Sequence, residues 1–218
     1  MTLPGARTVL LIGFDPFGGD TINPSWEAVS RLGGDIIGGR NIVAVQLPTT
    51  FGGAPRALRA ALRRHASELV ICVGQAGGRS ALSLERVAIN VNDARIPDNA
   101  GAQPIDTPVI ARGPAAYFTT LPIKSIHAEL LAAGIPSEIS QTAGTFVCNQ
   151  VFYVLMHALA GTRTRGGFVH IPFLPQQVEA LPGTPSLDLD TVVAGLRVCI
   201  DTVLRTRKDR PIVAGATH

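Results

Sequence analysis

The sequence has 218 residues, of which 46% are hydrophobic and 16% are charged, and its formal net charge is +3. This length suits one large α/β domain, and the apolar content excludes disorder as the main state. Lys and Arg are scattered without interleaved aromatic residues, so we expect no nucleic-acid partner. The short basic runs at Arg63–Arg64 and Arg205–Arg210 are interpreted as solvated helix faces or ends.

The cysteine content and the N-terminus exclude several further classes. Three cysteines, Cys72, Cys148 and Cys199, argue against a disulfide scaffold, and no C-x-x-C or H-x-x-x-H spacing suggests a metal site. The first apolar run is too short to span a membrane and continues into DPFGG rather than a cleavage site. We therefore expect a first strand there, no membrane association and a cytoplasmic protein.

Apolar runs alternate with amphipathic stretches along the chain, which predicts an α/β sandwich with a largely parallel sheet. One domain is expected over residues 1–218, with a loose tail from about residue 207. Strands are predicted at Thr8–Phe14, Asn41–Leu47, Leu69–Gly74, Ser137–Ser140 and Gly167–Pro172, and less clearly at Leu84–Asn92. Helices are predicted at Ser25–Leu32 after Asn23-Pro24, Ala54–His65, Ile123–Ala133, from about Cys148, and at Leu189–Arg205 after Asp188.

Two glycine-rich loops follow predicted strands, but neither has a known phosphate-binding pattern. Gly13 and Gly18 have the spacing of a phosphate loop, yet Gly-Asp follows where Lys-Ser or Lys-Thr is needed. Gly74, Gly77 and Gly78 do not fit the G-x-G-x-x-G dinucleotide pattern. Both loops nevertheless lie at carboxyl ends of predicted parallel strands, where open α/β sheets bind their ligands.

Cys148 is the candidate nucleophile, because it lies where a predicted strand, Ser137–Ser140, turns into an apolar helix. The first turn of a helix presents unpaired N–H groups and a partial positive charge. We therefore expect a thiol at this position to ionise more easily. The alternative interpretation of Cys148 is a buried structural thiol.

A cysteine nucleophile needs a base and a group that orients that base. Among five histidines, His170 is the candidate because it lies near the end of an apolar strand; the alternative is a hydrogen-bonded core histidine. His157 is about 13 Å along the helix from the cysteine, too far for contact. Glu85 and Asp93 are both candidate orienting acids. Their alternatives are a surface ion pair between Glu85 and Arg86 and a loop-bracing charge network that includes Asp93.

Ten segments, spread in order over nearly the whole chain, resemble the pyroglutamyl-peptidase I family, also called pyrrolidone-carboxylate peptidases. The match is weak only in Gln176–Asp188 and after Arg207. The segments are GFDPFGG (Gly13–Gly19), INPSW (Ile22–Trp26), QLPT (Gln46–Thr49), VGQAGGR (Val73–Arg79), ERVAIN (Glu85–Asn90), ARIPDN (Ala94–Asn99), GPAAYF (Gly113–Phe118), LPIK (Leu121–Lys124), SQTAGTFVCN (Ser140–Asn149) and GFVHIPFLP (Gly167–Pro175).

This resemblance implies a cytosolic cysteine peptidase that removes an N-terminal pyroglutamyl residue from peptides through a thioester. It implies a three-layer α/β/α sandwich of the phosphorylase/hydrolase type, a homotetramer, and no cofactor or metal. The family's triad falls on Glu85, Cys148 and His170, which favours Glu85 over Asp93.

The resemblance also implies a substrate pocket. Pyroglutamate is a small, uncharged lactam, so its pocket needs apolar walls and a few placed hydrogen bonds. Arg95 is expected near the oxyanion hole and Gln75 close to the substrate. Asn23 is a candidate for a lactam contact, in competition with its helix-capping role. The expected walls are Phe14, Phe17, Thr49, Ile96, Phe146 and Val147.

Two other interpretations remain open on the sequence. One is a different enzyme on a related fold, such as a nucleoside phosphorylase or a general cysteine hydrolase. The other is a catalytically silent binding protein that retains the fold.

Overall fold

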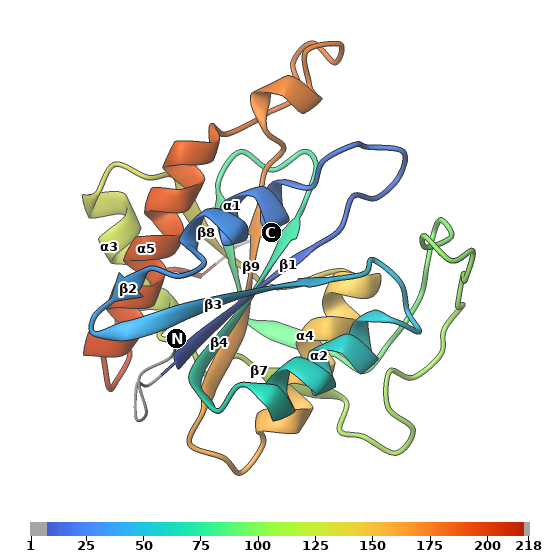
Figure 1. Cartoon of the computed structure of the whole chain (residues 1–218), viewed down its shortest axis with the longest axis horizontal. Helices are drawn as coiled ribbons and strands as arrows, with labels where there is room; N and C mark the ends of the chain where they lie inside the picture. The colour runs from blue at the N-terminus through green and yellow to red at the C-terminus, as the bar shows by residue number, and fades with distance from the viewer. Residues whose placement is uncertain (1–7, 216–218) are drawn as a thin grey trace.

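The computed structural model describes residues 8–215, which form a seven-stranded sheet between two layers of helices (Figure 1). The strand order in this sheet is β2-β3-β1-β4-β9-β5-β8, and β6 pairs with β7 in a separate small sheet. The strands are β1 Thr8–Phe14, β2 Ile36–Ile37, β3 Arg40–Leu47, β4 Ser67–Gln75, β5 Leu82–Glu85, β6 Val87–Ile89, β7 Ala116–Phe118, β8 Ser137–Ser140 and β9 Arg165–Ile171.

Helices cover both faces of the large sheet. Helices α1, α3 and α5 pack on one face, and α2 and α4 pack on the other (Figure 1). A short 3-10 helix, η1, lies in the arm of residues 172–188 that projects from the top of Figure 1. The helices are α1 Pro24–Leu32, α2 Ala54–Arg64, α3 Ile123–Ala132, α4 Val147–Leu159, η1 Pro175–Gln177 and α5 Leu189–Arg205.

The sheet is mixed but mostly parallel. Among the described strands, β1 pairs in parallel with β3 and β4, β4 with β9, and β5 with β8. The β2–β3 and β5–β9 pairings are antiparallel. The expected three-layer sandwich with a largely parallel sheet is confirmed. Because β1, β4 and β9 run in one direction, their carboxyl ends meet at one edge of the sheet.

The alternation of side chains along the strands divides the core into two. On β9, Val169 and Ile171 belong to the core under α1, α3 and α5, whereas Phe168 belongs to the core under α2 and α4. The leucines of β5 also join the α5 side. Since successive side chains of a strand point to opposite faces, Glu85 and His170 both lie on the α4 face.

Most predicted elements match the structure within one or two residues, and the unclear strand at Leu84–Asn92 is the main difference. It is two strands, β5 in the large sheet and β6 in the small one, which separate at Arg86. The long loop predicted over 93–120 contains only β7 and the bridge that pairs Asn92 with Thr107.

The predicted helix caps are confirmed. Asn23 Oδ1 accepts a hydrogen bond of 3.0 Å from Ser25 N at the start of α1. Asp188 Oδ1 accepts one of 2.8 Å from Thr191 N at the start of α5. Each cap satisfies a backbone donor that the helix itself leaves unpaired, which explains why both helices begin where the sequence predicted.

The tail is less loose than its composition suggests. Asp209 accepts hydrogen bonds from the backbone N–H groups of Lys124 and Ser125, at 3.1 and 2.7 Å, in the first turn of α3. Lys124 Nζ donates to the carbonyl of Ile212. The segment therefore caps α3, whose own N-cap residue Pro122 has no side-chain donor or acceptor to offer.

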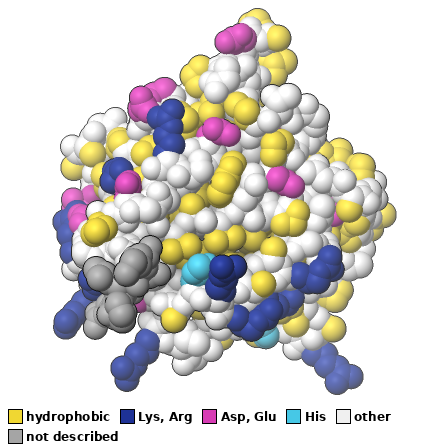
Figure 2. Space-filling view, viewed as in Figure 1, with side chains coloured by type: hydrophobic (Ala, Val, Ile, Leu, Met, Phe, Trp, Pro, Cys, Tyr) yellow, Lys and Arg dark blue, Asp and Glu magenta, His cyan; other side chains and the backbone are white. Residues whose placement is uncertain are grey.

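Basic side chains gather over α2. Figure 2 shows Lys and Arg along the lower edge of the face on which α2 lies in Figure 1. The arginines Arg56, Arg59, Arg63 and Arg64 of this helix are all exposed, as expected for a solvated helix face. None of the helices between residues 8 and 215 is both long and apolar enough to cross a bilayer.

The other two thiols, Cys72 on β4 and Cys199 on α5, are completely buried. Burial raises the pKa of Cys72 far above its ordinary value and raises the pKa of Cys199 to about 12. Above about pH 9 the unfolded chain loses these protons while the folded chain keeps them. The free energy of unfolding should therefore fall as pH rises, by about 1.4 kcal/mol per pH unit and thiol.

We expect the free energy of unfolding to fall less steeply with rising pH in Cys199→Ala, because one of the two titrating buried thiols is removed. Val192→Ala is the matched control, because it removes a similarly buried side chain from α5 without removing a titrating group. Urea unfolding of both variants between pH 8 and pH 11 makes the comparison. Equal slopes in the two variants would contradict the buried-thiol interpretation.

Candidate active site

Cys148 is the second residue of α4, directly after the turn that follows β8. Gly144 in this turn has φ 74°, a left-handed conformation that glycine adopts without strain. The N-cap residue, Phe146, makes no side-chain hydrogen bond to the helix. The first-turn N–H groups of α4 thus have no side-chain cap from Phe146, and that of Cys148 is placed to stabilise a developing oxyanion.

Gly74 on β4 determines where the thiol lies. A Cβ added at Gly74 would lie 3.0 Å from Cys148 Sγ and 2.8 Å from Phe168 Cζ, so both side chains rest on bare backbone. Gly74 is the register partner of His170 on β9. The thiol therefore lies over a sheet position that is one strand spacing, about 4.8 Å, from the backbone of His170.

His170 and Glu85 form a buried hydrogen-bonded pair. His170 Nδ1 and Glu85 Oε1 are 2.8 Å apart, and the residues are 4% and 0% exposed. An ionised carboxylate at Glu85 can only accept, and in that state Nδ1 donates to it and Nε2 is free to accept a proton. The Phe168 ring, 4.7 Å from the imidazole between centroids, packs beside it.

The structure separates the candidate acids and bases that the sequence left open. Asp93 is exposed, and its backbone N–H and carbonyl groups form hydrogen bonds with Thr145. His127 Nδ1 contacts Ser137 Oγ, and His157 Nδ1 contacts the Tyr117 hydroxyl. His218 lies outside the described residues.

The thiol is held protonated in the resting structure. Burial and the charge of Glu85 together raise the pKa of Cys148 to about 12, although the charge of Arg79 acts to lower it. The expectation that the helix start makes this thiol ionise easily is therefore wrong for the resting enzyme, because desolvation is the larger effect. Attack by the sulfur requires a base that removes the proton at the moment of reaction.

Arg79 contacts the candidate acid, although its place in the VGQAGGR motif does not by itself indicate this contact. Its Nη1 donates to Glu85 Oε1 at 2.9 Å, so Glu85 Oε1 accepts from Arg79 and His170 together. The surface ion pair considered between Glu85 and Arg86 does not form. Arg86 instead donates to Gln141 Oε1 at 2.9 Å.

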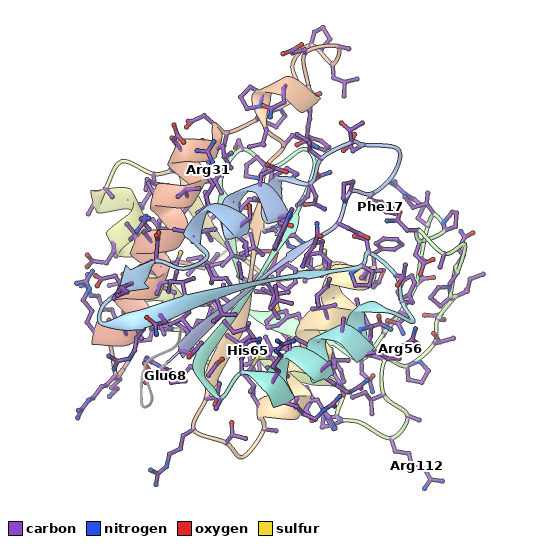
Figure 3. All side chains as sticks on the ribbon, viewed as in Figure 1. Phe17, Arg31, Arg56, His65, Glu68 and Arg112 are labelled. Carbon is purple, nitrogen blue, oxygen red and sulfur yellow. The ribbon has the colours of Figure 1, made fainter. Side chains whose placement is uncertain are left out.

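Three aromatic rings pack together at the start of α4, close in the chain to the candidate nucleophile. The Phe146 ring lies 5.2 Å from Phe17 and 5.1 Å from Phe51, between centroids. Figure 3 places Phe17 at the upper right, between the loop after β1 and the loop of residues 93–115. Phe51 was not predicted. Phe14 and Val147, expected as walls, are buried in the core under α2 and α4.

Asp15 holds the polar residues of this region in place. Its carboxylate accepts from Thr49 N at 2.6 Å, and its carbonyl accepts from Thr49 Oγ1 and from Asn23 Nδ2. Asn23 Oδ1 also accepts from the backbone and the hydroxyl of Ser25. The side chain of Asn23 is thus committed to the helix cap and to Asp15, and its lactam contact stays a prediction.

Two further expected residues lie on an exposed loop, and hydrogen bonds made by a neighbouring residue hold this loop in place. Arg95 and Ile96 are exposed on the 93–115 loop. Asn99, further along this loop, donates to the carbonyls of Pro16 and Thr49 at 2.8 and 3.2 Å. The loop is therefore fixed against the segments that carry Phe17 and Thr49.

Gln75 is oriented by a residue of the projecting arm. Gln177 Nε2 donates to Gln75 Oε1 at 3.1 Å and to Asp20 Oδ2 at 2.9 Å. Because Oε1 of Gln75 accepts from Gln177, its Nε2 group is the part that can donate to a substrate carbonyl. Gln177 lies where the family resemblance is weak, so no motif could have identified it.

A cavity of about 650 Å³ lies elsewhere, at the amino ends of β4 and β9 between α2 and α4. His65 and Glu68 line it and are labelled below and to the left of Phe17 in Figure 3. It contains none of the candidate catalytic residues. Among residues 8–215, no group of three or more His, Cys, Asp or Glu side chains is placed to hold a metal ion.

Comparison with known proteins identifies the family. Residues 7–206 match the pyroglutamyl peptidase family. This chain belongs to the pyroglutamyl peptidase family. It is 59% identical over 213 residues to pyrrolidone-carboxylate peptidase 1 of Ralstonia nicotianae, covering 97% of this chain and 99% of that protein. It is 55% identical to pyrrolidone-carboxylate peptidase of Klebsiella pneumoniae, covering 96% and 99%.

Solved structures of pyroglutamyl peptidases have the same fold. Pyroglutamyl peptidase I from Bacillus amyloliquefaciens superposes with a TM-score of 0.92 at 48% identity, covering 95% of this chain and 100% of that one. A mutant pyrrolidone carboxyl peptidase from Pyrococcus furiosus gives 0.88 at 40% identity, covering 91% and 98%. Pyroglutamyl peptidases of this family are cysteine peptidases that remove N-terminal pyroglutamyl residues.

We expect Gly74→Ala to lower kcat at least tenfold, to order of magnitude, because an added methyl displaces Cys148 Sγ or Phe168 and misplaces the reacting atoms. Gly52→Ala is the control, since its methyl meets only the flexible end of Arg56 at 3.5 Å. Steady-state kinetics on a pyroglutamyl anilide measure both variants. Unchanged kcat in a folded Gly74→Ala enzyme would contradict this placement of the thiol.

Proposed function

We propose that the chain hydrolyses the amide bond after an N-terminal pyroglutamyl residue with Cys148 as nucleophile, His170 as base and Glu85 as the group that orients His170. The observation that carries the assignment is the buried 2.8 Å hydrogen bond between His170 and Glu85, on the same sheet face as the thiol. Family membership supports the reaction itself.

The reaction proceeds in two halves. His170 Nε2 removes the thiol proton as Cys148 Sγ attacks the pyroglutamyl carbonyl, and Glu85 stabilises the resulting imidazolium. The oxyanion faces the N–H groups at the start of α4, each worth about 3 kcal/mol. His170 then gives its proton to the leaving amine, and a thioester remains. Water attacks the thioester while His170 accepts its proton, and free pyroglutamate and the thiol are released.

Specificity would come from aromatic walls and a few hydrogen bonds. Phe17 and Phe146 would pack on the flat lactam ring, with Ile96 and Thr49 close by. Gln75, Arg95 and Asn23 remain the proposed polar contacts. Proline lacks the ring carbonyl, so a donor placed for that carbonyl would be left unpaired, which can discriminate by about 10⁴.

Three further features concern the chain as a whole. We propose that residues 1–218 act as one peptidase domain, that the chain works in the cytoplasm, and that it assembles as a homotetramer. The packing of both helical layers on one sheet supports the single domain.

We expect Cys148→Ser to abolish cleavage of a pyroglutamyl anilide, since an alkoxide forms far less readily than a thiolate in a buried site. The prolyl anilide should be cleaved negligibly by the unmodified enzyme. The absorbance of the released aniline at saturating substrate measures turnover, and circular dichroism checks the fold. Retained turnover would refute the nucleophile assignment, and turnover that depends on inorganic phosphate would favour a phosphorylase.

We expect Phe17→Ala to lower kcat/KM about tenfold or more, because an aromatic wall of the pocket is lost. Phe118→Ala is the control: Phe118 is 68% exposed on β7 and outside the Phe17–Phe146–Phe51 cluster. Both variants are compared on the pyroglutamyl anilide. Equal kcat/KM values would remove Phe17 from the pocket.

A further inference from the structure

Glu85 is an unusually placed carboxylate. Its side chain is 0% exposed, and its Oε2 atom has no hydrogen-bond partner among the described residues. Its Oε1 atom accepts from two donors, Arg79 Nη1 at 2.9 Å and His170 Nδ1 at 2.8 Å. Arg79 is therefore the cationic group in direct contact with a carboxylate that is shielded from water.

Such a carboxylate has two possible states with opposite consequences for His170. A buried carboxyl group without a cationic partner generally takes up a proton, because desolvation penalises its charged form. A protonated carboxyl can donate to Nδ1, which would leave the proton on Nε2, the atom that must accept from Cys148. An ionised carboxylate can only accept, which keeps Nε2 free.

We propose that Arg79 is a positioning residue that keeps Glu85 ionised and so fixes the tautomer of His170 that can accept the proton of Cys148. Arg79 touches neither the thiol nor the lactam in this role and acts through Glu85. The inference rests on the proposed catalytic roles of Glu85, Cys148 and His170.

The setting of Arg79 fits this role. Its guanidinium is 26% exposed and lies between the buried Glu85 and solvent. Nη2 donates to the carbonyl of Thr142 at 3.3 Å, in the turn that leads to Cys148. One side chain thus joins the acid of β5 to the segment that positions the nucleophile.

Arg86 provides the internal comparison. It adjoins Glu85 in sequence, yet successive residues of an extended chain point to opposite sides, and its Nε donates to Gln141 Oε1 instead. The chain therefore has two arginines near Glu85 of which only Arg79 contacts it. Arg86→Met is a matched control for a change at Arg79.

Other charged or titratable groups surround the pair. Glu138 on β8 lies 3.9 Å from Arg79 Nη1, is 53% exposed and accepts from Ser83 Oγ at 2.6 Å. Cys148 faces it from α4, with Cys72 of β4 beyond. Burial and Glu85 raise the pKa of Cys148, whereas Arg79 lowers it. Loss of Arg79 would remove the cation that contacts Glu85 and that lowers the pKa of Cys148.

The test is the pH dependence of kcat and KM on a pyroglutamyl anilide for Arg79→Met, Arg79→Lys and Arg86→Met. We expect Arg79→Met to lower kcat at neutral pH about 10²-fold with KM changed less than about twofold. The acidic limb of the pH profile of kcat should move to higher pH by about one unit or more in this variant. Arg79→Lys keeps the charge and should restore the limb, and Arg86→Met should match the unmodified enzyme. A purely structural role of Arg79 predicts lower activity with an unmoved profile, which would overturn the proposal.

A double-variant cycle with Glu85→Gln separates this inference from the proposed triad. If Arg79 acts through Glu85, Arg79→Met should change kcat little once Glu85 is already Gln. Additive losses would overturn the role of Arg79 while leaving the triad intact. Full activity of Glu85→Gln alone would refute the triad itself. Should Arg79→Met not fold, the same cycle with Arg79→Gln, which also removes the positive charge, decides by the same criterion.

Discussion

The proposed active site depends on one oxygen atom, Glu85 Oε1, which contacts His170 and Arg79 in a position without access to water. In this environment a hydrogen bond is electrostatically strong, but an unmatched charge is costly. The imidazole is therefore held firmly only while the carboxylate has a cationic partner. Two neighbouring features accompany this pair: a glycine at 74 that leaves room for the sulfur, and a helix whose first N–H groups are not capped by Phe146.

The sheet brings these groups together through its one central reversal of direction. Glu85 is at the carboxyl end of β5, which runs antiparallel to β9, so it lies diagonally across from His170 on the same face. The side-chain alternation of β5 and β9 sends their aliphatic residues to the α5 face, and Ser83, Glu85 and His170 to the α4 face. The residues with proposed chemistry thus occupy the face that also receives Cys148.

Much of this could be predicted from the sequence because it depends on local patterns. Asn23 and Asp188 mark helix starts, and Cys148 lies at a strand–turn–helix junction. The residues alone could not separate Glu85 from Asp93, because the antiparallel β5–β9 pairing has no local signature. Arg79, Phe51 and Gln177 escaped prediction because their roles rest on contacts between distant segments. The thiol pKa was expected to fall, but desolvation outweighs the partial charge of a helix end.

The distances along the chain between the paired groups have a kinetic consequence. Glu85 and His170 are 85 positions apart, and β9, which carries His170, is the last strand to be synthesised. Closing contacts of such long sequence separation is slow compared with helix formation. During refolding, helical signal should therefore return before the ability to turn over substrate. Recovered enzymatic activity would then report the docking of the final strand rather than the formation of local structure.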